Sequence, residues 1–150
     1  MSSPSTRVSE DLRAAMKARD RVRLAALRLL ATSLRNRVVE VGRELTEEEF
    51  LEVVGREVKR RKEAADAYTA AGREELAERE REEQRTLEGY LPEGLSEDEG
   101  RALIEEAVTA TGASGPGDMG KVMGFVMGRA RGRVDGAAVS AIVRERLASG

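Results

Sequence analysis

A glycine at every fourth position of one segment constrains this chain more than any other feature. Residues 118–136 place glycine at 120, 124, 128, 132 and 136. One glycine in a helix interior costs roughly 1 kcal/mol relative to alanine, so several on one flank of a helix require an explanation. Two explanations stay open at this point: another helix crosses unusually close, or the backbone of a ligand does.

The other side chains of this segment follow a helical pattern. An apolar stripe at i, i+3, i+4, i+7 and i+8 is formed by Met119, Val122, Met123, Val126 and Met127. The glycines lie beside this stripe, and a third face carries basic and aromatic side chains. Gly132 suits the position just after a helix end, and Asp135 suits the N-cap of a following helix.

The third face and the glycine flank form a candidate nucleic-acid surface. Lysine and arginine would contact phosphates, and the glycines would let phosphate or sugar approach the helix backbone. The candidate nucleic-acid-binding residues of this segment are Lys121, Phe125, Arg129, Arg131, Arg133, Gly120, Gly124 and Gly128. The alternative is purely structural, with a core stripe and a close helix crossing.

The residue types that most catalysis requires are missing. The 150 residues include no Cys and no His, which excludes a disulfide framework, a thiol nucleophile and a zinc–thiolate site. Without histidine, the chain also lacks the commonest general base and the commonest metal ligand. Carboxylates gather at predicted helix starts, where the helix dipole accounts for them. We therefore predict no catalytic residue, no metal site and no cofactor.

Charge is segregated along the chain although the net charge is only −2. Residues 7–43 hold ten basic residues against four acidic ones, and residues 119–150 hold six against two. Residues 74–106 hold thirteen acidic residues against four basic ones. The basic regions permit a polyanionic partner, and the acidic region would suit a basic protein; the alternative is that folding neutralises these charges internally.

No segment approaches the roughly 20 apolar residues that span a bilayer, and no signal peptide follows Met1. These features predict a cytoplasmic protein without membrane contact.

Apolar periodicity is helical nearly everywhere, and no segment alternates with a period of two. The sequence predicts an all-α fold, with an elongated N-terminal four-helix part and a C-terminal three-helix domain. The helices are expected near 6–19, 20–41, 46–72, 73–90, 96–112, 118–130 and 136–148. Residues 91–94 interrupt the pattern, so we predict domains at 1–92 and 93–150.

Helix ends are signalled by capping residues. Thr46 with Glu49, and Ser96 with Glu99, match the capping-box pattern. Asp20 is expected to cap the second helix, and glycines at 42, 72 and 112 are expected to end helices.

Two further basic groups are candidate phosphate contacts. Arg28 and Arg35 lie on a ridge of the second helix away from its leucine stripe, and a solvated surface is the alternative. Lys59 and Lys62 belong to the densest basic run, at 56–62. The alternative for this run is ion pairing with Glu80, Glu82 and Glu83 across a helical hairpin.

Several stretches together resemble a known family. They are REVKRRK (56–62) followed by AGREEL (71–76), LEGYLP (87–92) running into Leu95 and Ser96, and DMGKVMGFVM (118–127) continuing through GRVDG (132–136). EDLRAAMK (10–17) and residues 28–30 extend the similarity. The chain resembles the GatB/YqeY family, specifically the free-standing YqeY-like proteins, over nearly its whole length.

The resemblance implies an all-α protein whose C-terminal part is similar to the tail domain of GatB, a component of the glutamine-dependent Asp/Glu-tRNA amidotransferase. In that enzyme the tail recognises tRNA, and the family label brings carbon–nitrogen ligase activity with glutamine as amido-N-donor by association. The amidase Ser–Ser–Lys machinery and the GatB kinase domain are both missing here.

Three functions follow as hypotheses. The first is a non-catalytic module that binds tRNA or another structured RNA and is an accessory, with a protein partner, to tRNA-dependent amidation. The second is a helical protein–protein interaction module without a nucleic-acid role. The third is an amidotransferase-associated enzyme, which the residues argue against.

Overall fold

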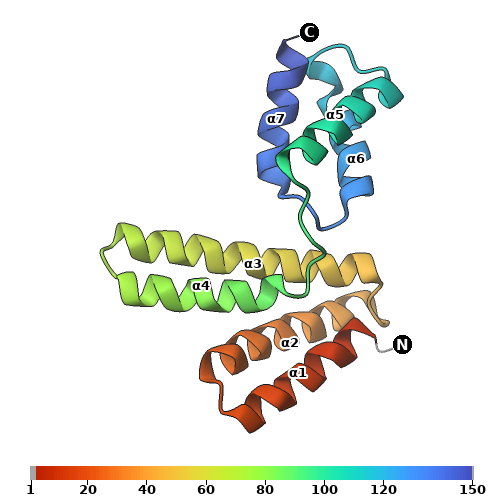
Figure 1. Ribbon diagram of the computed structural model, residues 1–150. Helices are drawn as coiled ribbons and strands as arrows, with labels where there is room; N and C mark the ends of the chain where they lie inside the picture. The colour runs from red at the N-terminus through yellow and green to blue at the C-terminus, as the bar shows by residue number, and fades with distance from the viewer. Residues whose placement is uncertain (1–2, 150) are drawn as a thin grey trace. The chain divides into compact units, whose positions relative to one another are not determined.

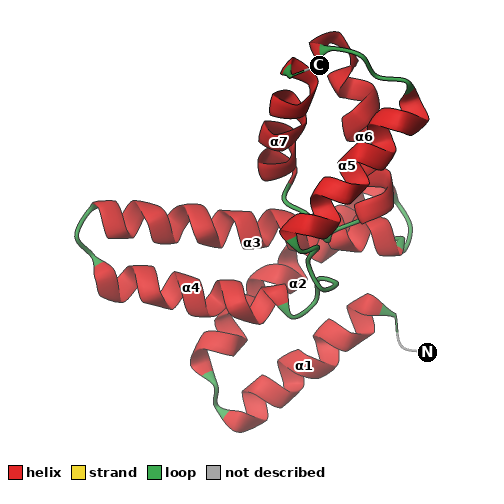
Figure 2. Cartoon of the chain, turned by 45° about the horizontal axis from the view of Figure 1, so that its top comes forward, coloured by secondary structure: helices red, strands yellow, loops and turns green. Residues whose placement is uncertain are grey.

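The computed structural model describes residues 3–149, and these form helices joined by short turns (Figure 1). No strand occurs among the described residues (Figure 2), and the predicted all-α class is confirmed. The elements are α1 (Pro4–Ala18), α2 (Arg21–Val41), α3 (Glu47–Ala70), α4 (Glu74–Glu88), α5 (Glu97–Thr111), the 3-10 turn η1 (Pro116–Asp118), α6 (Met119–Ala130) and α7 (Gly136–Ala148).

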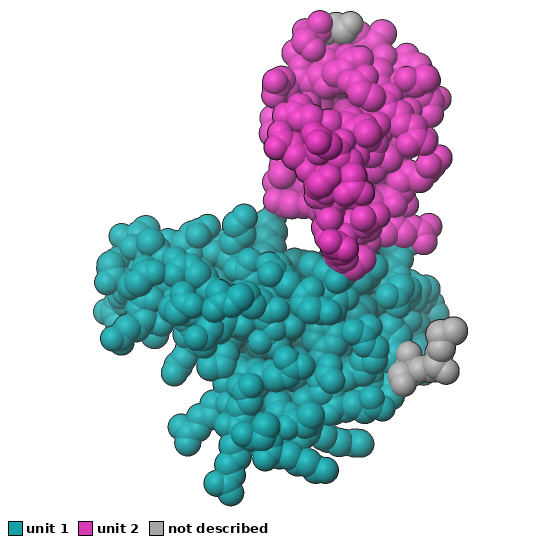
Figure 3. Space-filling model, in the orientation of Figure 1, with its two compact units in different colours: residues 1–91 teal, residues 92–150 magenta. Residues whose placement is uncertain are grey.

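The chain divides into two compact units, Met1–Leu91 and Pro92–Gly150 (Figure 3). The first unit contains α1 to α4, and the second contains α5, η1, α6 and α7. The division falls in the turn after α4, where Pro92 has no backbone N–H with which to continue a helix.

Local caps fix where the helices begin and end. In front of α3, Oγ1 of Thr46 accepts from the Glu49 amide at 3.1 Å, and Oε1 of Glu49 accepts from the Thr46 amide at 2.9 Å. Ser96 and Glu99 form the same reciprocal pair in front of α5. Both predicted capping boxes are confirmed. Gly42 ends α2 with a left-handed φ of 74°, which an L side chain adopts only with strain.

The core of the first unit joins the α1–α2 pair to the α3–α4 hairpin, whose helices run side by side in Figure 1. Its largest fully buried side chains are Phe50, Leu27, Leu30, Leu87, Val8 and Val54. The rings of Phe50 and Tyr90 meet edge to face with centroids 6.3 Å apart. The Tyr90 hydroxyl donates to Oδ2 of Asp11. This contact ties the end of α4 to α1.

The core of the second unit lies among its three helices. Its buried residues are Ile104, Ala107, Val122, Val126, Val139, Val143 and Leu147. Met119 and Met123 pack partly against this core, as their place on the predicted stripe requires. Met127 is 37 % exposed, so its assignment to the buried stripe is wrong. The stripe is narrower than predicted because only two other helices cover α6 in this unit.

Candidate nucleic-acid interface

The glycines of α6 lie on its uncovered side. Gly120, Gly124 and Gly128 are all exposed, whereas Val122 and Val126 on the other side are fully buried. A Cβ atom placed at any of the three glycines would have no described atom within 4 Å beyond the helix itself. No helix of the second unit therefore crosses close to this flank, so the predicted close crossing is not found within that unit, whereas the predicted core stripe is present in Val122 and Val126.

We call the exposed flank formed by Gly120, Gly124 and Gly128 the glycine face. Lys121 lies at its amino-terminal end. Its side chain is 67 % exposed, and its Nζ lies 3.7 Å from Oδ1 of Asp118. Asp118 in turn accepts from the Ser114 amide at 2.9 Å, and this hydrogen bond lowers the pKa of the Asp118 carboxyl, with Lys121 contributing. Lys121 is thus held near the start of α6 while most of its surface stays in solvent.

Arg129 and Phe125 form one stacked pair on α6. The guanidinium carbon of Arg129 lies 4.7 Å from the Phe125 ring centroid, within the range of a cation–π contact. Nη1 of Arg129 also donates to Oε1 of Glu106 on α5 at 3.1 Å. Phe125 itself is half-buried against the core. One face of its ring is therefore already occupied, and the ring is poorly placed to stack on a base.

Arg131 and Arg133, which we predicted together as phosphate contacts, both lie in the loop between α6 and α7 but have different surroundings. Arg131 is exposed, and its Nε reaches only the nearby Gly128 carbonyl at 3.2 Å. Arg133 is half-buried, and its Nε donates to the Glu93 carbonyl at 2.8 Å. The Arg133 carbonyl accepts from the Leu95 amide at 2.9 Å. Arg133 therefore holds the segment 93–95 in place, in addition to any contact with a ligand.

The remaining candidates lie in the first unit, two on α2 and two on α3. Arg28, Arg35, Lys59 and Lys62 are all exposed, and none forms an ion pair with a described residue. Within the run at 56–62, Arg61 pairs across the hairpin with Glu80 at 3.4 Å. Arg60 and Arg61 also pair with Glu57 on their own helix. The predicted hairpin pairing thus holds for Arg61 and not for the two lysines.

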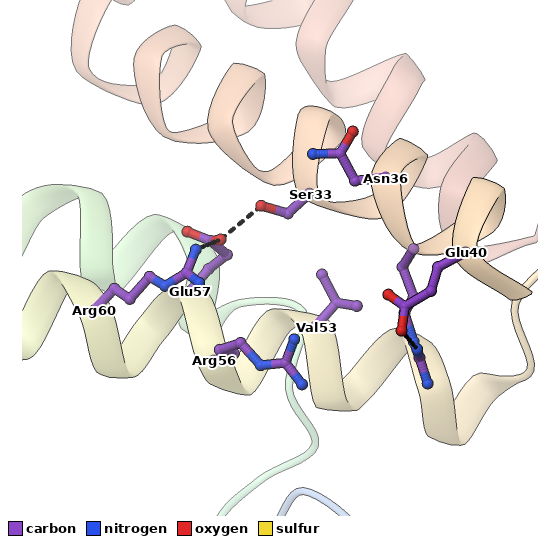
Figure 4. Close-up of a pocket in the computed structure, with 8 residues that line it drawn as sticks. Ser33, Asn36, Glu40, Val53, Arg56, Glu57 and Arg60 are labelled. Atoms are coloured by element: carbon purple, nitrogen blue, oxygen red, sulfur yellow. Dashed lines mark hydrogen bonds and ion pairs between the residues drawn. The ribbon is translucent and has the colours of Figure 1, made fainter.

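A cleft between α2 and α3 was not predicted from the sequence. It has a volume of about 150 Å³ and is lined by Ser33, Asn36, Arg37, Glu40, Val53, Arg56, Glu57 and Arg60 (Figure 4). Glu57 is only 3 % exposed, and its Oε1 accepts from the Ser33 hydroxyl at 2.6 Å and from Arg60 at 2.9 Å. The available signal was the position of Glu57 four residues after Val53 on the apolar side of α3.

The acidic side chains of the described residues do not gather into a metal-binding cluster. No group of three or more Asp and Glu side chains among residues 3–149 is arranged to hold a metal ion. The cleft carboxylates Glu40 and Glu57 each accept from an arginine. The described helices also include none with the length and apolarity needed to cross a membrane.

The chain matches a family of known proteins. No curated protein matches the chain. The family model described as Yqey-like protein matches residues 5–147, a span that runs from α1 into α7 and includes both units. The resemblance inferred from the sequence motifs is thereby confirmed, and the chain belongs to the YqeY-like protein family.

Proposed function

We propose that the chain is a non-catalytic module that binds tRNA or another structured RNA through the glycine face of α6. The observation that carries this proposal is the uncovered flank of Gly120, Gly124 and Gly128, with exposed Lys121 and Arg131 near its two ends. A helix surface without side chains lets a sugar–phosphate backbone come close to the peptide groups. The basic side chains then contact phosphates on either side.

The energetics of α6 support this assignment. Each glycine forgoes roughly 1 kcal/mol of helix stability relative to alanine, and no close contact within the second unit compensates for it. Structured RNA is recognised mainly by shape and by phosphate and 2′-hydroxyl contacts. A basic surface suits that mode better than stacking on unpaired bases does, since Phe125 is engaged by Arg129.

The similarity of the C-terminal part to an amidotransferase tail domain suggests the biological setting. We propose an accessory role in tRNA-dependent amidation, in which the reaction itself belongs to a partner enzyme.

A salt titration of binding to total tRNA, with the purified full chain, tests the proposal. The logarithm of the affinity should fall linearly with the logarithm of salt concentration. Lys121→Glu combined with Arg131→Glu should weaken binding and make that slope shallower by about two, because two phosphate contacts are lost. The matched control is Arg13→Glu with Lys17→Glu, a double charge reversal at exposed positions of α1. Equal affinities of wild type and the α6 double variant would contradict the proposal.

A second comparison separates RNA from a protein partner on the same face. Alanine at positions 120, 124 and 128 adds three methyl groups to the glycine face while preserving every charge. We expect this variant to fold at least as stably as wild type and to bind tRNA more weakly. If tRNA binding is absent and a stoichiometric protein that survives nuclease treatment is lost from the alanine variant instead, the helical interaction module is the correct function.

A further inference from the structure

The cleft between α2 and α3 has an unusual charge arrangement. Arginines from both walls face it, Arg37 from α2 and Arg56 and Arg60 from α3. The two carboxylates of the lining are each already paired, Glu40 with Arg37 at 2.8 Å and Glu57 with Arg60 at 2.9 Å. Three guanidinium groups against two carboxylates leave the lining with one uncompensated positive charge.

Arg56 supplies that charge. Its side chain makes no ion pair and no hydrogen bond with any residue from 3 to 149, and it lines the cleft together with Val53, also on α3 (Figure 4). All five of its N–H donors are therefore available. The neighbouring arginines are less free, since Arg60 is positioned by a carboxylate that is itself fixed by Ser33. The wall around Arg56 is thus organised before any ligand arrives.

The donor geometry favours one class of ligand. Donors come from two opposing helices rather than from a single arginine fork, and Asn36 adds an exposed amide. A planar carboxylate is matched by one fork, whereas a tetrahedral phosphate accepts from several directions. The cleft volume of about 150 Å³ is about ten times the roughly 10–15 Å³ that one water molecule needs on the same measure. A phosphate group with part of its hydration shell fits this space.

We propose that this cleft binds one phosphate group through Arg56, with Asn36 and the free N–H groups of Arg37 and Arg60 completing the contacts. The group is either free phosphate or a phosphodiester of a nucleic-acid backbone. The site belongs to the first unit and stands independently of the α6 surface.

The test is a titration of the full-length, isotope-labelled chain with inorganic phosphate at constant ionic strength, followed by NMR. Resonances of the Arg56 guanidinium and of the backbone at 33, 36 and 57 should shift and saturate. Arg56→Gln should raise the dissociation constant by about tenfold or more, because a hydrogen bond to a charged group is lost. Asn36→Asp should raise it as well, by placing a negative charge at the site. Arg13→Gln, an exposed arginine on α1, is the matched control and should change nothing.

A short single-stranded RNA distinguishes the two sources of phosphate. RNA that moves the same resonances and is displaced by phosphate identifies a backbone phosphodiester. Saturable binding of phosphate without any effect of RNA identifies the free anion. Shifts that never saturate, or equal dissociation constants for wild type and Arg56→Gln, overturn the site. These readouts do not depend on Lys121 or Arg131, so failure of the α6 surface and failure of the cleft are separate results.

Discussion

Nε of Arg133 donates to the backbone carbonyl of Glu93 at 2.8 Å, across 40 residues of sequence. The Leu95 amide donates to the Arg133 carbonyl at 2.9 Å, so the same residue holds the segment 93–95 twice. Arg133, which we predicted to contact RNA, thus helps to hold the second unit together. Charge reversal at this position would therefore confuse folding with binding, whereas Lys121 and Arg131 avoid that problem.

Arg133→Ala should loosen the segment before α5. Losing the hydrogen bond to the Glu93 carbonyl is expected to cost about 1 kcal/mol, which corresponds to roughly fivefold faster exchange where opening is local. The measurement is amide hydrogen exchange at Leu95. Arg131→Ala removes a nearby arginine with no tie to this segment and should leave Leu95 unchanged. Identical exchange in the two variants would mean that the side-chain contact contributes nothing.

Gly124→Ala should stabilise the second unit. The new methyl group meets no described atom within 4 Å apart from its own helix, and the substitution gains about 0.4–1 kcal/mol from reduced entropy of the unfolded chain. Thermal unfolding should show a higher midpoint. Gly112→Ala is the opposing control, because Gly112 has a left-handed φ of 67° and alanine there should lower the midpoint. A lower midpoint for Gly124→Ala would indicate a contact on the glycine face.

Ser33→Ala should destabilise the first unit by about 1–3 kcal/mol. The hydroxyl donates to the carboxylate of Glu57, whose side chain is only 4 % exposed, and its removal leaves that buried acceptor with fewer partners. Chemical denaturation gives the free energy of unfolding. Ser9→Ala, at an exposed serine of α1, should change it by less than about 0.5 kcal/mol. Comparable values for both serines would refute an energetic role for the Ser33–Glu57 bond.

Glu49→Gln should flatten the acid dependence of stability. The hydrogen bond from Arg43, together with the Thr46 amide, lowers the pKa of Glu49 from 4.5 to about 2. Because the folded state lowers this pKa, the stabilisation is complete above pH 4.5 and is lost as the pH falls toward 2. The wild type should therefore lose stability across this window more steeply than the variant. Glu48→Gln, at an exposed residue of the same turn, should keep the wild-type slope.

Helix ends were predictable because the signals that set them are local. Thr46 and Glu49 meet across three residues, and Ser96 with Glu99 repeats the pair. Asp20 and Asp135 cap α2 and α7 as predicted, through amides two or three residues ahead. Such bonds need no information about distant parts of the chain, so a single sequence suffices to find them.

Features that depend on which helices cover a face were harder to predict. Met16 follows the apolar pattern of α1 but is 54 % exposed, because periodicity gives the direction of a side chain and not the width of the surface that buries it. For the same reason, the sequence alone could not decide whether another helix or a ligand lies against the glycines of α6. Glu57 was missed because its partner Ser33 lies 24 residues earlier, on another helix.

The bare flank of α6 also bears on protein engineering. A search for greater thermal stability would replace Gly120, Gly124 and Gly128 early, since alanine is tolerated sterically and favoured in a helix. If the glycine face binds RNA, these same replacements would produce a robust but inactive protein. Variants selected for stability should therefore carry alanine at these three positions, whereas variants selected for binding should keep glycine. A comparison of the two sets of sequences would show what the glycines are for.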